Sequence, residues 1–169
     1  MLLTFFRVCS LFLLVTAMLT TLHLPSNSIA DDTKPIPRFA SLKKDVVNLR
    51  AGPNKRHPIV WVYKKRNLPI KITAEFDVWR RILDHEGATG WVHQRLLSGY
   101  RTLIITGKNR TLMDNPGVNS VPVATLETGV IAKISSCNQN WCKVKVKGLK
   151  GWLKRGQFWG ILEDEILEN

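Results

Sequence analysis

The sequence predicts an all-β chain that folds as two small β-barrels in tandem. Three observations predict this class. A segment of about 60 residues is repeated, short apolar runs are separated by turn residues, and no window of 11 or more residues shows a helical period. The chain has 169 residues, 44% of them hydrophobic, which is enough apolar material for one ordinary domain or two small ones.

The repeat consists of three anchors that recur in the same order and at nearly the same spacing. Leu49–Pro53 (LRAGP) is echoed by Leu112–Pro116 (LMDNP), and Trp79 is echoed by Trp141. The third anchor, a G-x-x-G-W motif, begins at Gly87 and again at Gly148. Its glycines allow the tight bend of a hairpin. Because a unit of about 60 residues is marginally stable alone, we expect the two barrels to dock.

The elements of the first unit follow from its apolar runs and turns. Strands are expected at Val46–Arg50, Ile59–Tyr63, Leu68–Ala74, Trp79–Asp84 and Gly90–His93, and Arg101–Thr106 leads into the second unit. The predicted organisation is an N-terminal linker at 31–39, a first barrel at 40–104, a second barrel at 105–162 and an acidic tail at 163–169.

Residues 1–30 are predicted to be a secretory signal peptide. Arg7 precedes an apolar centre at Cys9–Leu19, and Ser28-Ile29-Ala30 supplies the small residues that favour cleavage between Ala30 and Asp31. The alternative is an uncleaved anchor, but the apolar run is shorter than the roughly 20 residues of a membrane span. The mature protein is therefore expected in the periplasm or secreted, with membrane contact only before cleavage.

Cys137 and Cys142 are the two cysteines that remain after cleavage, and they flank an Asn-rich turn. Alternating residues on both sides, Val130–Ile134 and Lys143–Val146, predict a β-hairpin. An oxidising compartment favours a disulfide between these cysteines. Closing so short a loop stabilises by about 2 kcal/mol. Two cysteines are too few for a zinc site, and we expect neither metal nor cofactor.

The charge of the chain is +12, and it becomes +11 when the peptide containing Arg7 is removed. A basic surface attracts polyanions through a long-range field that salt screens. Outside the cytoplasm these are anionic glycans, cell-wall peptides with free carboxylates and lipid headgroups, and nucleic acid is not expected as a partner. The alternative is that the charge only keeps a small secreted protein soluble.

The motifs of the first unit resemble those of the bacterial SH3-like (SH3b) domain, in the exported tandem form found in Gram-negative bacteria. The resemblance rests on Leu49–Pro53, Glu75–Ile82 and Gly90–His93, and it extends over roughly residues 38–161. The second unit departs from the pattern, with Met113 in place of Arg50 and Asn115 in place of Gly52. The resemblance implies two small SH3-like β-barrels with a groove that binds peptide or cell wall.

Aromatic residues interleaved with cations are the candidate binding residues, because such a surface suits a glycan, a peptide backbone or a carboxylate. The alternative for the tryptophans is a place in the core, and for the lysines from Lys143 to Lys147 a role in guarding an exposed sheet edge. The candidates are Trp61, Tyr63, Trp79, Arg81, Trp91, Trp141, Lys143 and Trp152.

Catalysis has little support in the sequence, and no catalytic residue is predicted. His57, His85 and His93 lie in no metal-ligand pattern, and the chain has no G-x-S-x-G motif and no phosphate-binding loop. The leading hypothesis is a non-enzymatic exported module that binds cell-wall peptide, peptidoglycan or an envelope protein. The alternative is an adaptor that regulates an envelope enzyme on another chain, and a third hypothesis is a hydrolase without a recognisable motif.

Overall fold

The computed structural model describes residues 34–168, and these residues form an all-β fold of two tandem units, as predicted. Fourteen strands and one short 3-10 helix, η1 (Gln94–Leu96), make up the secondary structure of this range. The predicted signal peptide, with its cleavage site between Ala30 and Asp31, lies outside the described residues. Within the described range, no helix has the length and apolar character needed to cross a membrane.

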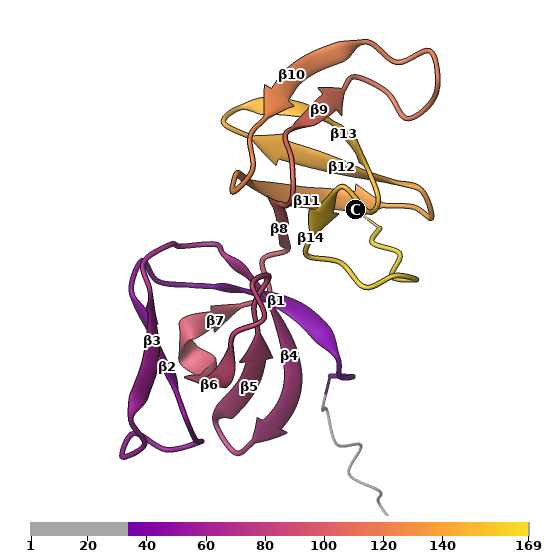
Figure 1. The fold of residues 1–169 in the computed structure, drawn as a ribbon. Coiled ribbons are helices and arrows are strands. Elements are labelled where there is room, and N and C mark those ends of the chain that lie inside the picture. The colour runs from indigo at the N-terminus through magenta and orange to yellow at the C-terminus, as the bar shows by residue number, and fades with distance from the viewer. Residues whose placement is uncertain (1–33, 169) are drawn as a thin grey trace, which may run out of the picture. The chain divides into compact units, whose positions relative to one another are not determined.

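Each repeat forms one seven-stranded sheet (Figure 1). The first sheet has the order β3-β2-β6-β5-β4-β1-β7, and the second has the order β10-β9-β13-β12-β11-β8-β14. The first contains β1 (Arg38–Leu42), β2 (Val47–Arg50), β3 (Ile59–Tyr63), β4 (Pro69–Phe76), β5 (Trp79–Leu83), β6 (Thr89–His93) and β7 (Leu97–Ser98). The second contains β8 (Thr102–Ile105), β9 (Arg110–Met113), β10 (Pro122–Leu126), β11 (Ile131–Cys137), β12 (Trp141–Val146), β13 (Leu149–Lys154) and β14 (Phe158–Trp159).

The two orders are identical when every strand is advanced by seven, so the repeat seen in the sequence is a repeat of the whole topology. Each sheet has its own hydrophobic core, and corresponding residues occupy both cores. Leu49 and Leu112 are one such pair, with exposed fractions of 1% and 0%. Burying a side chain of this kind stabilises the fold by about 1.5–3 kcal/mol. The corresponding pairs are Leu49/Leu112, Ile82/Val144 and Val92/Leu153.

The two glycines of each G-x-x-G-W motif have different roles. Gly87 and Gly148 adopt positive φ angles of 92° and 86° in the turn, as predicted. The second glycine instead permits a close approach between strands. A Cβ on Gly90 would lie 2.8 Å from the carbonyl oxygen of Arg50, and one on Gly151 would lie 2.6 Å from that of Met113. This spacing explains why each motif needs glycine immediately before its tryptophan.

The first strand of each repeat begins earlier than the domain boundary expected from the sequence. β1 begins at Arg38, inside the expected linker, and β8 begins at Thr102, before the expected division after residue 104. All four residues of β8 are buried, so the alternation that marks a half-exposed strand is missing there. Ile104 belongs to the first core although β8 pairs in the second sheet, and the Thr102 hydroxyl donates to the Asn67 carbonyl at 2.8 Å.

The predicted hairpin and disulfide of the second repeat are confirmed. Cys137 at the end of β11 and Cys142 near the start of β12 are joined, and they are register partners in the two strands. Cys142 is fully buried, together with Val144 on the same face of β12. The disulfide therefore closes the hairpin on the core side of the sheet.

Candidate binding grooves

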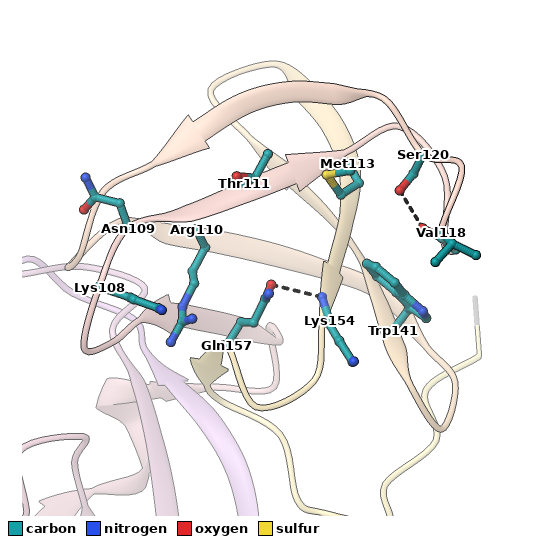
Figure 2. Close-up of a pocket in the computed structure, with 11 residues that line it drawn as sticks. Lys108, Asn109, Arg110, Thr111, Met113, Val118, Ser120, Trp141, Lys154 and Gln157 are labelled. Carbon is teal, nitrogen blue, oxygen red and sulfur yellow. Dashed lines mark hydrogen bonds between the residues drawn. The ribbon is translucent and has the colours of Figure 1, made fainter.

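Two grooves occupy corresponding positions in the two repeats. The first has a volume of about 450 Å³, and the second has a volume of about 400 Å³ (Figure 2). The first groove is lined by Val46, Asn48, Arg50, Lys55, Trp79, His93, Arg95 and Leu96. The second is lined by Lys108, Asn109, Arg110, Thr111, Met113, Gly117, Val118, Ser120, Trp141, Lys154 and Gln157.

The correspondence extends to individual lining positions. When the two repeats are aligned on their three anchors, the counterparts are Val46/Asn109, Asn48/Thr111, Arg50/Met113, Lys55/Val118, Trp79/Trp141, His93/Lys154 and Leu96/Gln157. Strand alternation accounts for the wall formed by the first two strands of this group. Val47 and Leu49 of β2 are buried, so Asn48 and Arg50 between and beside them face outward. The groove is thus a property of the repeated fold, and the side chains within it are what differ.

A tryptophan lies in each groove opposite a basic or titratable partner on the next strand. In the first repeat Trp79 is the register partner of His93, and the two rings meet edge to face with their centroids 5.4 Å apart. Trp79 is 8% exposed, so little of its ring is open to a ligand. In the second repeat Trp141 is the register partner of Lys154 and is only half-buried. The second groove therefore offers more of its indole to a ligand.

Both grooves are basic, and none of the described residues that line them is acidic. Arg50, Lys55 and Arg95 supply the cations of the first groove. The Arg50 guanidinium is held in place because it donates to the carbonyl of His57 at 2.8 Å. In the second groove the cations are Lys108, Arg110 and Lys154. Such a lining favours anionic ligands, because cations without acidic neighbours retain their capacity to bind carboxylates.

Beside each groove lies a second tryptophan paired with a cation on the same outer face of the sheet. Arg81 is the register partner of Trp91 in the first repeat. In the second repeat Lys143 is the partner of Trp152, and its ammonium group lies 5.8 Å from the centre of that ring. Six of the eight predicted binding residues thus gather in two corresponding aromatic and basic surfaces. They are Trp79, Arg81 and Trp91 in the first repeat and Trp141, Lys143 and Trp152 in the second.

The other two predicted binding residues lie elsewhere. Tyr63 is 5% exposed, and its hydroxyl donates to Asp84 at 2.8 Å, so it belongs to the core and not to a binding surface. Burial, reinforced by the hydrogen bond to the Asp84 carboxylate and its charge, raises the pKa of Tyr63 well above its usual value. Trp61 is 54% exposed on β3, an edge strand, and lines neither groove.

The structure also places residues that the sequence did not single out. Lys55 and Lys108 lie in loops and Arg95 lies in η1, so the alternation of a strand gives no guide to their direction. The edge-guarding alternative for the lysines is wrong for β12, because that strand is an interior strand between β11 and β13. Lys143 packs on Trp152 instead of protecting an edge.

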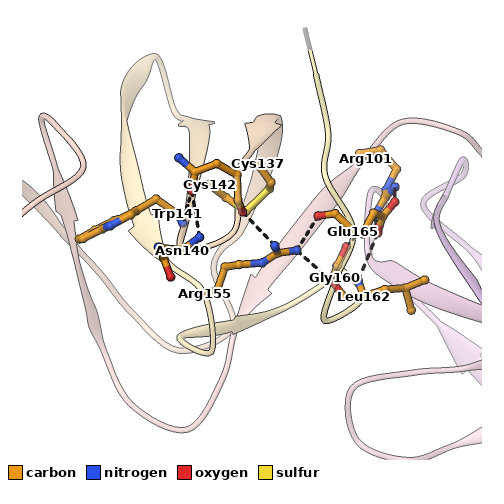
Figure 3. Close-up of a disulfide and its surroundings, with 10 residues drawn as sticks. Arg101, Cys137, Asn140, Trp141, Cys142, Arg155, Gly160, Leu162 and Glu165 are labelled. Atoms are coloured by element: carbon orange, nitrogen blue, oxygen red, sulfur yellow. Dashed lines mark hydrogen bonds and ion pairs between the residues drawn. A yellow bond between two sulfur atoms is a disulfide. The ribbon is translucent and has the colours of Figure 1, made fainter.

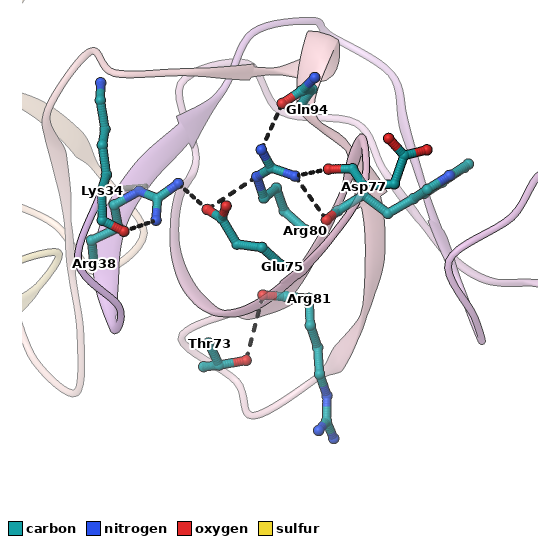
Figure 4. A network of polar contacts seen from close by, with 9 residues as sticks. Lys34, Arg38, Thr73, Glu75, Asp77, Arg80, Arg81 and Gln94 are labelled. Atoms are coloured by element: carbon teal, nitrogen blue, oxygen red, sulfur yellow. Dashed lines mark hydrogen bonds and ion pairs between the residues drawn. The ribbon is translucent and has the colours of Figure 1, made fainter. Parts of the chain in front are cut away.

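The hairpin that carries each groove tryptophan is fixed by a different device in the two repeats. In the first repeat Glu75 and Arg80 are register partners, and Arg80 Nε lies 3.1 Å from Glu75 Oε1 (Figure 4). Arg38 on β1 also forms an ion pair with Glu75. In the second repeat the corresponding positions carry the disulfide between Cys137 and Cys142.

The C-terminal segment fastens onto the second repeat near this disulfide (Figure 3). Arg101, the counterpart of Arg38, forms an ion pair with Glu165. Arg155 donates to the carbonyls of Leu162 and Glu165 at 3.0 and 2.6 Å. Leu167 pairs with Cys137 through two backbone hydrogen bonds of 2.8 and 3.0 Å. In the part that the structure describes, residues 163–168 of the predicted acidic tail therefore lie along the disulfide hairpin, and we call this segment the strap.

The profile of the family described as bacterial SH3 domain matches the chain twice, at residues 43–99 and 107–160. Each match corresponds to one repeat. No curated protein sequence matches the chain. Among residues 34–168, no group of three or more His, Cys, Asp or Glu side chains is placed to hold a metal ion.

Three solved structures are similar to this chain at low TM-scores. NlpC2 from Trichomonas vaginalis has 8% identity and a TM-score of 0.35, with 75% of this chain and 49% of that chain covered. NlpC1 from the same organism has 10% identity and a TM-score of 0.35, with coverages of 76% and 48%. A proposed autolysin from Listeria monocytogenes has 20% identity and a TM-score of 0.33, with coverages of 75% and 63%. The chain thus spans about half to two thirds of the length of these proteins.

Proposed function

The chain belongs to the bacterial SH3 domain family, and from this premise we propose that it is a non-catalytic, exported binding module. Its ligand is an anionic cell-wall peptide of peptidoglycan, which it holds in the two grooves and on the tryptophans beside them. The single observation that carries the proposal is that both repeats place a tryptophan in a groove that, among residues 34–168, is lined by cations and by no acidic residue. Nucleic acid is not part of the proposal.

The chemistry of the grooves supports this class of ligand. A tryptophan offers a flat apolar surface to a peptide backbone or a sugar ring, and a guanidinium or ammonium group beside it binds a carboxylate through a charge-assisted hydrogen bond. Grooves of about 400 to 450 Å³ accept a few residues of an extended peptide. Two such grooves in one chain would raise the avidity for a polymer that repeats the same ligand.

The disulfide supports the exported location. Structural disulfides persist in oxidising compartments such as the periplasm or the outside of the cell, and the disulfide between Cys137 and Cys142 is part of the folded second repeat. We place the mature protein there, after cleavage between Ala30 and Asp31. Mass spectrometry of the protein recovered from the producing cell tests the location, because a retained N-terminus or a cytoplasmic protein would contradict it.

Retention on isolated peptidoglycan sacculi at low salt tests the proposed ligand. We expect the protein without residues 1–30 to be retained and to elute as salt increases, because salt screens the attraction. The variant Arg50→Ala/Arg95→Ala should weaken retention through the first groove, and Lys108→Ala/Lys154→Ala should weaken it through the second. A matched control, Lys64→Ala/Arg66→Ala, removes the same charge from a turn outside both grooves.

The control separates groove binding from general attraction. If the control variant loses retention as much as the groove variants do, net charge accounts for binding and the grooves do not. If the unaltered protein is not retained at any salt concentration, the cell-wall ligand is wrong.

A second candidate function, that of an adaptor for an envelope protein, is favoured by the edge strand β3. Four consecutive residues of β3, from Ile59 to Val62, are 46%, 51%, 54% and 40% exposed, and β3 has one neighbour in the sheet. An exposed apolar edge of this kind is a template for an added strand. The basic turns at Lys55-Arg56 and Lys64–Arg66 flank it, so an extended segment with acidic ends fits better than a second copy of this chain.

Substitution of the edge strand tests the adaptor function. Val60→Lys places a charge on β3, and the matched control Val123→Lys alters the corresponding position of β10, which begins with Pro122. We expect site-specific crosslinking at Trp61 to capture one defined envelope protein, and Val60→Lys alone to abolish the capture. Equal loss in both variants, or capture of a second copy of the chain, would contradict the adaptor function.

A further inference from the structure

Arg110 stands at a position of the repeat that ought to be part of the core. Its counterpart in the first repeat is Val47, and both residues begin the corresponding strands β2 and β9. The register agrees, because Val47 pairs with Tyr63 and Arg110 pairs with Leu126, the counterpart of Tyr63. Val47 is 1% exposed and belongs to the first core. The second repeat has replaced a buried apolar side chain with a guanidinium.

The surroundings of Arg110 do not neutralise this charge. Its Nε atom is buried and has no hydrogen-bond partner among residues 34–168. No ion pair involving Arg110 is formed in the same range. A buried donor without a partner destabilises the fold, so packing alone does not explain why arginine stands here in place of valine.

The side chain faces the second groove, where it lies between Lys108 and Gln157 (Figure 2). The Oε1 atom of Gln157 accepts the backbone N–H of Lys154 at 3.3 Å, which leaves the amide nitrogen of Gln157 as a donor. Donors of three kinds, a guanidinium, two ammonium groups and an amide, thus line the groove. None of the described residues that line this groove is an acid that could accept hydrogen bonds from these donors.

We propose that the second groove is a carboxylate-binding site in which the Nε–H and one terminal N–H of Arg110 donate hydrogen bonds to the two oxygens of a peptide carboxylate. A guanidinium and a carboxylate match in such a two-point contact, and the ligand supplies the acceptor that Nε lacks. The first groove has no equivalent contact, because Val47 occupies the position. The inference rests on the proposed function and deepens it, since it assigns one two-point carboxylate contact to Arg110 of the second groove.

Titration of the ¹⁵N-labelled protein with two tripeptides tests the proposal by NMR. One probe is Ala-Ala-Ala with a free carboxylate, the second is the same peptide with an amide end, and inorganic phosphate is the third. We expect the free acid to shift the Arg110 Nε–H resonance and the Trp141 indole resonance. The amide should shift the Arg110 resonance at least tenfold less at equal concentration, because its end offers one acceptor and no charge. Phosphate should also have a smaller effect, since it lacks the peptide that contacts Trp141.

Two variants of Arg110 separate the contact from general charge. Arg110→Val installs the residue that the first repeat already tolerates, so the variant should fold, and it should weaken binding of the free acid at least tenfold. Arg110→Lys keeps the charge and removes the two-point geometry, and we expect it to behave more like Arg110→Val than like the unaltered protein. Circular dichroism and the dispersion of the NMR spectrum verify the fold of both variants.

Each outcome decides the proposal. An unmoved Nε–H resonance, equal shifts with the acid and the amide, equal shifts with phosphate, or full binding by Arg110→Lys would overturn it. Retention on sacculi distinguishes this failure from failure of the proposed function. If sacculi still retain Arg110→Val through the first groove, the cell-wall function stands, and the carboxylate site is judged by the titration alone. If sacculi do not retain the unaltered protein, the cell-wall function fails separately.

Discussion

The two repeats share one topology and one groove, but they close the hairpin beneath that groove in chemically different ways. The first uses the ion pair of Glu75 with Arg80, and the second uses the disulfide of Cys137 with Cys142 at the corresponding register positions. The backbone brings these two positions together in either case. The identity of the link is therefore free to vary, while its place in the hairpin is fixed by the fold.

This exchange has a consequence for the arginine on the neighbouring strand. In the first repeat Arg38 pairs with Glu75, so the hairpin itself supplies the acid. In the second repeat the acid has been replaced by Cys137, and the counterpart Arg101 pairs with Glu165 of the C-terminal segment. In the second repeat the carboxylate that neutralises this arginine therefore comes from outside the hairpin. The C-terminal segment supplies it, whereas the first repeat finds its carboxylate within the hairpin.

The groove tryptophans give the largest expected contrast between the repeats. Trp79→Ala should lower the free energy of unfolding by about 3–5 kcal/mol, because Trp79 is 8% exposed and its loss leaves a cavity. Trp141→Ala should cost clearly less, because Trp141 is only half-buried. Urea denaturation of both variants measures the difference. Equal losses would contradict this prediction, because they would mean that the two tryptophans stabilise the fold equally despite their different burial.

The hairpin links give the next contrast. Cys137→Ser/Cys142→Ser should cost about 2 kcal/mol, because the disulfide restricts a short loop of the unfolded chain. Glu75→Gln should cost about 1 kcal/mol, because Glu75 loses its charge against Arg80 and Arg38 while the side chains stay partly exposed and water screens the pairs. Chemical denaturation with and without a reducing agent checks both values. A larger loss for Glu75→Gln would reverse the ranking of the two links.

The sequence predicted the features that recur by spacing. The repeat, the hairpin and the shared face of Trp141 and Lys143 followed from alternation and from the regular spacing of the anchors, and the disulfide followed from the expected export of a chain with two cysteines beside one turn. Features that depend on a side chain crossing between elements could not be predicted. Tyr63 looked like a surface aromatic residue because its acceptor, Asp84, lies on a distant part of the chain. The sequence did not single out Arg110, because only the strand register shows that it stands at the position of the buried Val47.

The buried polar pair of the first core gives a smaller contrast. Tyr63→Phe should cost about 1–2 kcal/mol, because Asp84 loses a hydroxyl donor while its other oxygen keeps the backbone N–H groups of Glu86 and Ala88. The second repeat has Leu126 at the position of Tyr63, so its core has no such hydrogen bond to lose. Thermal denaturation of Tyr63→Phe measures the cost, and an unchanged melting temperature would show that the hydrogen bond adds nothing.

The smallest expected effect is a dependence on acid that Glu165 of the C-terminal segment gives to the second repeat. Burial alone would raise the pKa of Glu165, but hydrogen bonds from Arg101 and from the Leu162 N–H, together with the charges of Arg101 and Arg155, lower it below its ordinary value of 4.5. A carboxyl whose pKa is lower in the folded protein stabilises the fold fully above its ordinary pKa. It loses that effect as the pH falls through the folded value.

Glu165→Gln should therefore destabilise the protein at pH 7 by about 1 kcal/mol or less, and the difference from the unaltered protein should shrink as the pH falls below the ordinary carboxyl pKa of 4.5 and through the lower value of the folded protein. Thermal denaturation of both proteins between pH 7 and pH 2.5 measures this convergence. Glu163→Gln is the matched control, because Glu163 is exposed in the same segment and forms no ion pair among the described residues. If Glu163→Gln converged in the same way, the acid response would belong to the charge of the tail as a whole. Convergence confined to Glu165→Gln would instead assign it to the contact with Arg101, the point at which the second repeat differs from the first.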